Sequence, residues 1–78
     1  MFITITIKTD TGQADIRIDS EQKIGEGLKV LRQTGKLLPG LAPDYFRSCI
    51  KQDLVSAHKT FAEENIFDGD ILLAIESL

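Results

Sequence analysis

The first twenty residues alternate between apolar and polar side chains. Isoleucine takes every second position from residue 3 to residue 7, and the alternation returns at residues 14–19 after a turn at residues 9–12. A period of two with β-branched side chains is typical of strands that bury one face. Turn residues between two such runs indicate an antiparallel hairpin, here expected to carry a bulge at Gly12. Its inner face should carry Ile3, Ile5 and Ile7 on one strand and Ala14, Ile16 and Ile18 on the other.

Residues 21–34 have the period of a helix. Ile24, Leu28 and Leu31 fall on one stripe, which would cover the inner face of the hairpin. Ser20 is the expected N-cap, because its hydroxyl could accept a hydrogen bond from a free N–H group of the first turn. Gly35 is expected to end the helix.

Two glycines inside the predicted helix, Gly25 and Gly27, are unusual. Each lowers helix stability by about 1 kcal/mol relative to alanine. We therefore expect them to allow close packing of the helix on the sheet.

A third strand is predicted for residues 45–52, and its phase follows from the cost of burying polar groups. Placing Phe46, Ser48 and Ile50 inward buries one hydroxyl group, whereas the opposite phase buries the guanidinium of Arg47, which costs far more when unpaired. The first phase places Arg47, Cys49 and Lys51 on the outer face of the sheet.

The remaining residues complete the sheet. A short edge strand is expected around Leu54 and Val55, then one helical turn at residues 60–65 with Phe61 inward, and a final strand at residues 71–75. That last run is continuously apolar, as is typical of a central strand. The first and last strands must therefore lie parallel in the middle of the sheet. The prediction is an α+β fold, the β-grasp, with a mixed sheet of four to five strands on one helix and a single domain at residues 1–78.

Composition narrows the classes of function. The chain has 78 residues, 42% of them hydrophobic, and a net charge of −3, and its basic residues form no block. A nucleic-acid partner is therefore not expected, because phosphate binding needs clustered Lys and Arg. The single cysteine cannot form an internal disulfide, which favours a reducing compartment. No signal peptide or membrane-spanning run is apparent, so we expect a cytoplasmic protein without membrane insertion.

Catalytic and metal sites are weakly supported. Cys49 and His58 are the only residues of their types, and a Cys–His pair needs a third group to orient it. Asp68 and Asp70 flank Gly69, but the further ligands of a calcium loop are missing, so a turn is expected instead. We therefore expect no cofactor, no metal and no enzymatic activity; a small enzyme that uses Cys49 is the less favoured alternative.

The order of elements resembles that of ubiquitin, with a Thr9-Asp10-Thr11-Gly12 turn and a similar stretch at residues 60–66. From Tyr45 onward the chain more closely resembles the YukD-like (EsaB) proteins of bacterial type VII (WXG100) secretion systems. The shared features are an aromatic residue before Phe46-Arg47 and the motif Ile66-x-Asp68-Gly69-Asp70-x-Leu72. The resemblance implies a ubiquitin-like protein that binds a component of the secretion machinery as an accessory or regulatory subunit.

Conjugation is not expected. Ubiquitin-type modifiers need a tail that ends in Gly-Gly, whereas this sequence ends Ala74-Ile75-Glu76-Ser77-Leu78 and contains no adjacent glycines. YukD-like proteins similarly lack that tail.

The resemblance also implies a register for the last strand, with Leu72 and Ala74 in the core. Three apolar side chains would then share the outer face with the outward residues of the third strand, as a patch with a basic rim; such patches usually mark partner sites. The predicted protein-binding residues are Arg47, Cys49, Lys51, Ile71, Leu73 and Ile75. Periodicity alone favours the opposite register, with Ile71, Leu73 and Ile75 as core. A free-standing ubiquitin-like adaptor or homodimer unrelated to secretion is the alternative function.

Overall fold

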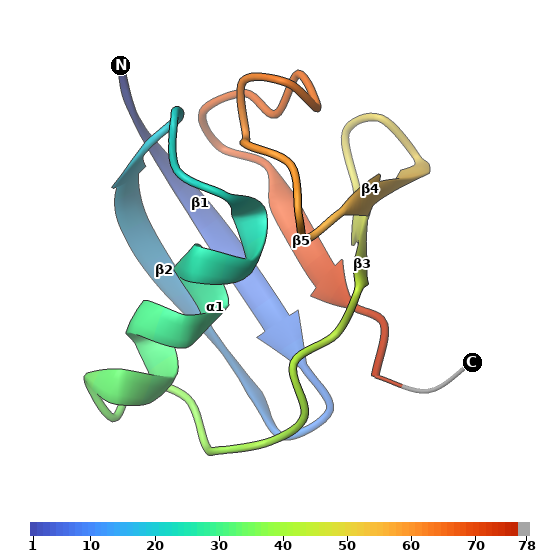
Figure 1. Cartoon of the computed structure of the whole chain (residues 1–78). Coiled ribbons are helices and arrows are strands. Elements are labelled where there is room, and N and C mark those ends of the chain that lie inside the picture. Colours follow the sequence, from blue (N-terminus) through green and yellow to red (C-terminus); the bar gives the residue numbers. More distant parts are fainter. Residues whose placement is uncertain (77–78) are drawn as a thin grey trace.

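A five-stranded sheet and one helix form the computed structural model, which describes residues 1–76; Ser77 and Leu78 of the predicted domain lie outside the described residues. The strand order is β2-β1-β5-β3-β4, with β1 and β5 parallel and the other pairs antiparallel. Figure 1 shows β5 in the middle of the sheet. The predicted α+β β-grasp is confirmed. The elements are β1 (Phe2–Thr9), β2 (Gly12–Asp19), α1 (Ile24–Gln33), β3 (Tyr45–Ser48), β4 (Asp53–Ser56) and β5 (Ile71–Ala74).

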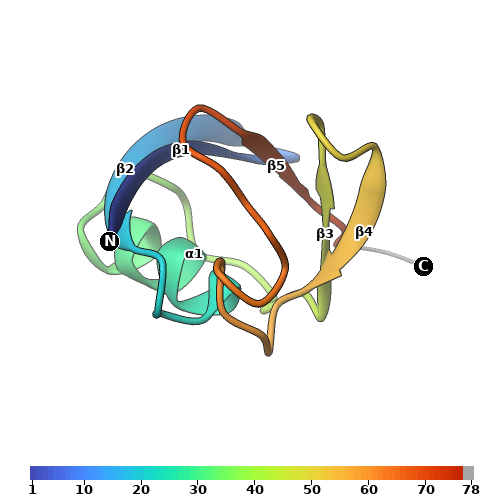
Figure 2. The same cartoon turned by 90° about the horizontal axis from the view of Figure 1, so that it is seen from above.

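The core lies between the helix and the concave side of the sheet. The sheet curls around α1, as Figure 2 shows from above. The helical stripe predicted from the sequence is buried, and so are the three isoleucines of β1. Ala14 and Ile16 are only partly buried, whereas Ile18 of the same edge strand belongs to the core. The fully or nearly fully buried side chains include Ile5, Ile7, Ile24, Leu31, Phe46, Val55, Phe61 and Leu72.

The first hairpin closes more tightly than the sequence predicts. Thr9 pairs directly with Gly12, so the loop consists of residues 10 and 11 alone, and the expected bulge is absent. The hydroxyl of Thr9 contributes by accepting a hydrogen bond from the N–H of Thr11. Gly12 therefore ends the loop as the first residue of β2.

The N-terminus of α1 lies later than predicted and is capped by backbone groups. Lys23 is the N-cap and makes no side-chain capping bond. The N–H groups of Ile24 and Gly25 donate instead to the carbonyl oxygens of Lys59 and Ala57, each at 2.9 Å. The capping role predicted for Ser20 is wrong, because these distant carbonyl groups already satisfy the orphan donors of the first turn. The predicted end is correct: Gly35 has a φ of 77° directly after the C-cap, the left-handed conformation that glycine tolerates best.

The two helical glycines pack closely, as predicted. A Cβ atom at Gly27 would lie 3.3 Å from both Ile7 Cδ1 and Phe61 Cζ, and a Cβ atom at Gly25 would lie 3.2 Å from the carbonyl oxygen of Ala57. Glycine at these two positions lowers the intrinsic stability of the helix, but it allows the helix to lie close to the rest of the core.

Strand β3 is shorter than predicted, although its phase is correct. Phe46 and Ser48 are fully buried, but Ile50 is 57% exposed and not part of the core. The strand ends because Ser48 closes a turn: its carbonyl oxygen accepts from the N–H of Gln52, and its hydroxyl oxygen accepts from the N–H of Lys51. Gln52 has a φ of 57°, which an extended strand cannot include.

Strand β5 has the register that the resemblance to YukD-like proteins implied. Leu72 is 0% exposed, and Ala74 packs partly buried against the core. Ile71, by contrast, is 38% exposed. The register predicted from periodicity alone, with Ile71 and Leu73 in the core, is therefore wrong.

Candidate protein-binding surface

The side of the sheet turned away from α1, here called the outer face, presents apolar residues at its centre. Ile71 and Leu73 alternate with the buried Leu72 along β5, so they point to this side. Because β5 lies between β1 and β3, neither residue is at an edge of the sheet. In Figure 2 the outer face is the convex side of the curled sheet.

A row of residues crosses the outer face at Leu73. Lys8 of β1 and Arg47 of β3 are the partners of Leu73 on its two sides, and Arg47 is in turn paired with Leu54 of β4. The row therefore alternates a basic and an apolar side chain across the sheet. Leu54 is 47% exposed, and it joins the face only because the β3–β4 register places it there.

Tyr45 also lies on the outer face, on the side that the predicted phase of the third strand implies, but it was not among the predicted binding residues. It is 44% exposed, and its carbonyl oxygen accepts a hydrogen bond of 3.1 Å from the N–H of Ile75. The predicted binding residue Ile75 is half-buried. An aromatic ring with a hydroxyl group at a surface is a common contact residue in protein interfaces.

Cys49 and Lys51, the predicted binding residues that follow Arg47 in the sequence, have different surroundings. Cys49 is exposed and lies beside Ile71, whose carbonyl oxygen accepts its N–H at 2.9 Å. Lys51 lies in the turn after β3, and its ammonium group donates to the carbonyl oxygen of Glu64 at 2.6 Å. The placement of Lys51 on the sheet face is therefore wrong, because Lys51 lies in the turn and its ammonium group is held by the carbonyl oxygen of Glu64.

A buried carboxylate fixes this part of the face. Asp70 is 1% exposed; it accepts hydrogen bonds from the hydroxyl of Ser48 and from the N–H groups of Ile50 at 3.1 Å and Ile71 at 2.7 Å. It thereby connects the turn after β3 to the first residue of β5. We call these contacts the Asp70 clamp.

Asp68 has a related role on the other side of β5, where it binds strand β1. Its carboxylate accepts a hydrogen bond from the N–H of Thr4 at 2.6 Å, and the N–H of Gly69 donates to the carbonyl oxygen of Thr4 at 2.7 Å. Both acidic residues of the Asp-Gly-Asp motif thus organise the backbone of a turn. Among residues 1–76 no group of three or more His, Cys, Asp or Glu side chains could hold a metal ion.

Cys49 and His58 do not form a pair. The β3–β4 register joins Tyr45 to Ser56 and Ser48 to Asp53, which places the two residues at opposite ends of the hairpin. The imidazole of His58 instead lies 2.9 Å from a carboxylate oxygen of Asp44. The geometry that a Cys–His nucleophile would need is not present.

Two exposed carboxylates have shifted pKa values. The N–H of Thr60, followed by its hydroxyl group, holds the pKa of Glu63 below its ordinary value of 4.5, in a reciprocal capping box. The N–H of Glu21, followed by the N-terminal ammonium group, similarly lowers the pKa of Asp19. Both groups stabilise turns that lie outside the outer face.

Within the described residues, no helix is long and apolar enough to cross a membrane. No family model matched the sequence, and no curated protein matched it either. Solved structures did match. The ubiquitin-like (UBL) domain of Plasmodium falciparum Dsk2 superimposes with a TM-score of 0.59 at 13% identity, over 95% of this chain and 99% of that one.

Further matches include a ubiquitin and a chain of a larger complex. Caldiarchaeum subterraneum ubiquitin has a TM-score of 0.59 at 18% identity, over 95% of this chain and 94% of its own. A chain of the pParkin-pUb-UbcH7 complex has a TM-score of 0.61 at 22% identity, over 97% of this chain but 23% of that one. The chain therefore has the ubiquitin-like β-grasp fold.

Proposed function

We propose that this protein is a non-covalent protein-binding module that docks through the outer face of its sheet. The observation that carries the proposal is the position of Ile71, which is 38% exposed, and of Leu73, which is half-buried. Both side chains are apolar and lie at the centre of the sheet, on the side turned away from the helix. Tyr45 and Leu54 extend the apolar area, while Lys8 and Arg47 border it with positive charge.

The chemistry of the face favours a partner with an apolar contact region and acidic residues around it. Apolar side chains supply the buried centre of an interface, and charged residues at its rim mainly set orientation and the association rate. Cys49 contributes here as a small contact residue, because a free thiol packs much like a small apolar group.

We further propose that the partner is a larger component of a type VII secretion system, such as its membrane ATPase or a channel subunit, and that the protein acts in the cytoplasm as an accessory or regulatory subunit. The resemblance of residues 45–78 to YukD-like proteins supports this pathway. Neighbouring genes for WXG100 proteins and an FtsK-like ATPase would agree with it. A gene without such neighbours would favour a free-standing adaptor or a homodimer.

Affinity purification from the native host tests the docking face. The Leu73→Glu variant should lose its partner and remain folded, because Leu73 is half-buried and does not belong to the core. Leu38→Glu is the matched control: it makes the same substitution at a leucine that is 60% exposed in the connection between α1 and β3, and it should retain the partner.

Two other results would contradict the proposal. Equal capture by the Leu73→Glu and Leu38→Glu variants would show that the outer face is not the docking surface. Loss of function in a folded Cys49→Ser variant that still binds its partner would instead favour the small Cys-dependent enzyme.

A further inference from the structure

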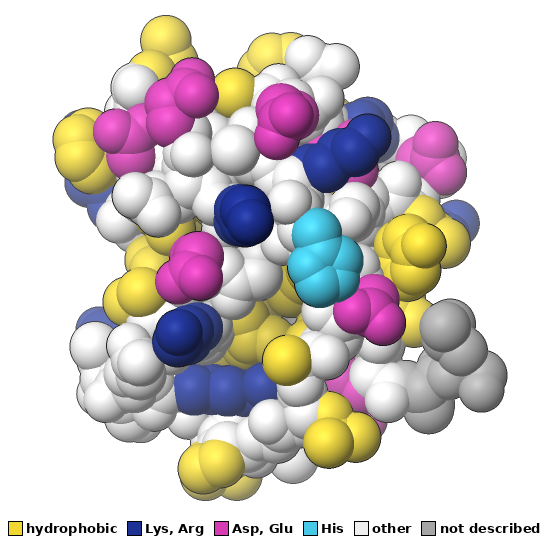
Figure 3. All heavy atoms as spheres, viewed as in Figure 1, with side chains coloured by type: hydrophobic (Ala, Val, Ile, Leu, Met, Phe, Trp, Pro, Cys, Tyr) yellow, Lys and Arg dark blue, Asp and Glu magenta, His cyan; other side chains and the backbone are white. Residues whose placement is uncertain are grey.

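A groove lies on the opposite side of the molecule from the outer face. It runs between α1, the connection that follows the helix, and the residues after β4, and it encloses about 700 Å³. Leu28, Pro43 and Ala57 are among its apolar lining residues. Figure 3, which looks at the helix side, shows hydrophobic atoms between basic side chains in the area below the single histidine.

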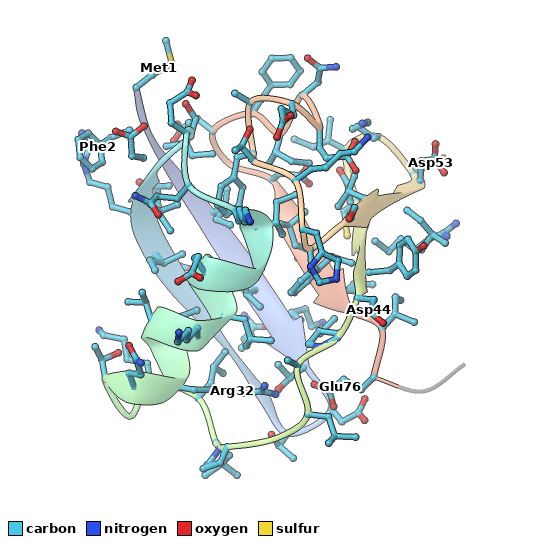
Figure 4. All side chains as sticks on the ribbon, in the orientation of Figure 1. Met1, Phe2, Arg32, Asp44, Asp53 and Glu76 are labelled. Atoms are coloured by element: carbon cyan, nitrogen blue, oxygen red, sulfur yellow. The ribbon has the colours of Figure 1, made fainter. Side chains whose placement is uncertain are left out.

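One wall of the groove is held in place by Arg32 of α1. Its guanidinium donates to the carbonyl oxygens of Leu38 at 3.1 Å, Gly40 at 3.2 Å and Leu41 at 2.8 Å. It also lies 3.6 Å from the carboxylate of Glu76, and Figure 4 shows these two side chains pointing toward each other.

Gly40 is part of the same arrangement, since a Cβ atom there would lie 2.7 Å from Arg32 Nη2. The wall is therefore preformed, which lowers the entropic cost of binding a ligand.

The charge of the groove differs from that of the whole chain. Lys23, Lys29 and Arg32 line it together with one acidic residue, Glu26, although the chain as a whole has twelve acidic and nine basic residues. Arg32 is engaged with the wall, but Lys23 and Lys29 are exposed and form no ion pair with any residue in the range 1–76. Two ammonium groups that form no ion pair within residues 1–76 therefore flank a floor to which the buried residues Leu28 and Ala57 contribute, together with Pro43.

We infer that this groove binds an acidic peptide segment of a second protein partner. Carboxylates of the segment would lie against Lys23 and Lys29, while one apolar side chain between them would pack over Leu28, Pro43 and Ala57. Because the groove and the outer face lie on opposite sides of the domain, one molecule can hold both partners at once. The inference goes beyond the proposed function and does not depend on the outer face.

A peptide titration followed by amide chemical shifts of the ¹⁵N-labelled protein tests the inference. The probe is a synthetic peptide with one leucine between pairs of glutamates, and the control peptide has lysine in place of each glutamate. The glutamate peptide should shift the amide signals of Gly25, Lys29, Ala57 and His58 in a saturable manner, and the lysine peptide should shift none of them. Replacing the leucine of the probe by alanine should weaken binding.

Matched charge variants make the test specific. The double variant Lys23→Glu, Lys29→Glu should bind the glutamate peptide at least about tenfold more weakly, since two attractive contacts become repulsive. The control Arg17→Glu, Lys36→Glu has the same net charge but alters basic residues outside the groove, and it should bind as the wild type does. Gly40→Ala should also weaken binding, because it displaces Arg32 from the wall.

Absence of saturable shifts, or equal weakening by both double variants, would overturn the inference. So would shifts confined to the outer face. Binding to vesicles with anionic lipids that depends on Lys23 and Lys29, without any binding of the glutamate peptide, would replace the peptide with a membrane surface and would equally refute it. None of these outcomes bears on the Leu73→Glu purification, so the two proposals fail independently.

Discussion

Replacing Asp70 by alanine should cost a large part of the stability of the domain. The carboxylate is 1% exposed and accepts three hydrogen bonds, from Ser48, Ile50 and Ile71. Each hydrogen bond to a charged group contributes about 1.5–3 kcal/mol, and a buried donor that is left unpaired costs about 1–3 kcal/mol. The costs of losing the three hydrogen bonds do not simply add, because the bonds share one carboxylate and the N–H of Ile50 is only part-buried. We therefore expect a total loss of about 3–5 kcal/mol.

That loss is large for a protein of this size. Domains are typically stable by about 0.05–0.15 kcal/mol per residue, so a chain of 78 residues would keep only part of its stability. The melting temperature should fall by about 4–8 °C for each kcal/mol lost. Urea denaturation followed by far-UV circular dichroism gives the free energy of unfolding directly.

Two further variants separate the Asp70 clamp from a general effect of removing an acidic residue. Asp68→Ala also removes a carboxylate that accepts a backbone N–H, but from an exposed position, and it should cost about 1 kcal/mol. Asp70→Asn keeps an oxygen for the two N–H groups and should lie between the wild type and Asp70→Ala. If Asp70→Ala costs no more than Asp68→Ala, the reasoning is wrong.

Three more predictions follow from the packing and the capping bonds. Gly25→Ala should destabilise the protein by about 1 kcal/mol in urea unfolding although it improves helix propensity, because the new Cβ meets the carbonyl oxygen of Ala57, which the N–H of Gly25 itself holds; a gain in stability would refute this. Leu72→Ala should cost about 2–5 kcal/mol and Leu73→Ala less than about 1 kcal/mol, and the reverse order would show that the β5 register is wrong. Because the pKa of Glu63 is lowered in the folded state, its contribution to stability is complete above pH 4.5 and is lost as the pH falls through the lowered pKa. The melting temperature of Glu63→Gln should therefore approach that of the wild type on acidification, and a constant difference would contradict the shift.

The features that were predictable from sequence are those set by local patterns. Residues close together in the chain were enough to predict the alternation of β1 and β2 and the buried stripe of α1. They also predicted the phase of β3, through the cost of burying Arg47. Gly25 and Gly27 predicted close packing, because glycine inside a helix lowers the stability of the helix. The run at residues 71–75 is apolar at both odd and even positions, so periodicity favoured one register only weakly, and that register was wrong. The register with Leu72 in the core was predicted from the resemblance to YukD-like proteins.

The features that the sequence did not reveal depend on contacts between distant segments. The N–H groups at the start of α1 donate to the carbonyl groups of Ala57 and Lys59. Residues next to the helix in the sequence do not indicate a cap of this kind. The Asp70 clamp joins residues that are 22 positions apart, and it ends β3 before Ile50. Leu54 lies on the outer face only through the register of β3 with β4.

The central claim is that the outer face around Leu73 contacts a partner protein. A photo-crosslinking amino acid in place of Leu73, compared in the native host with the same amino acid in place of Leu38 or Lys29, measures that contact directly. The account predicts a discrete crosslinked species at position 73, none at position 38, and at position 29 either none or a different partner. Crosslinks to the same protein from positions 38 and 29 but none from position 73 would contradict it.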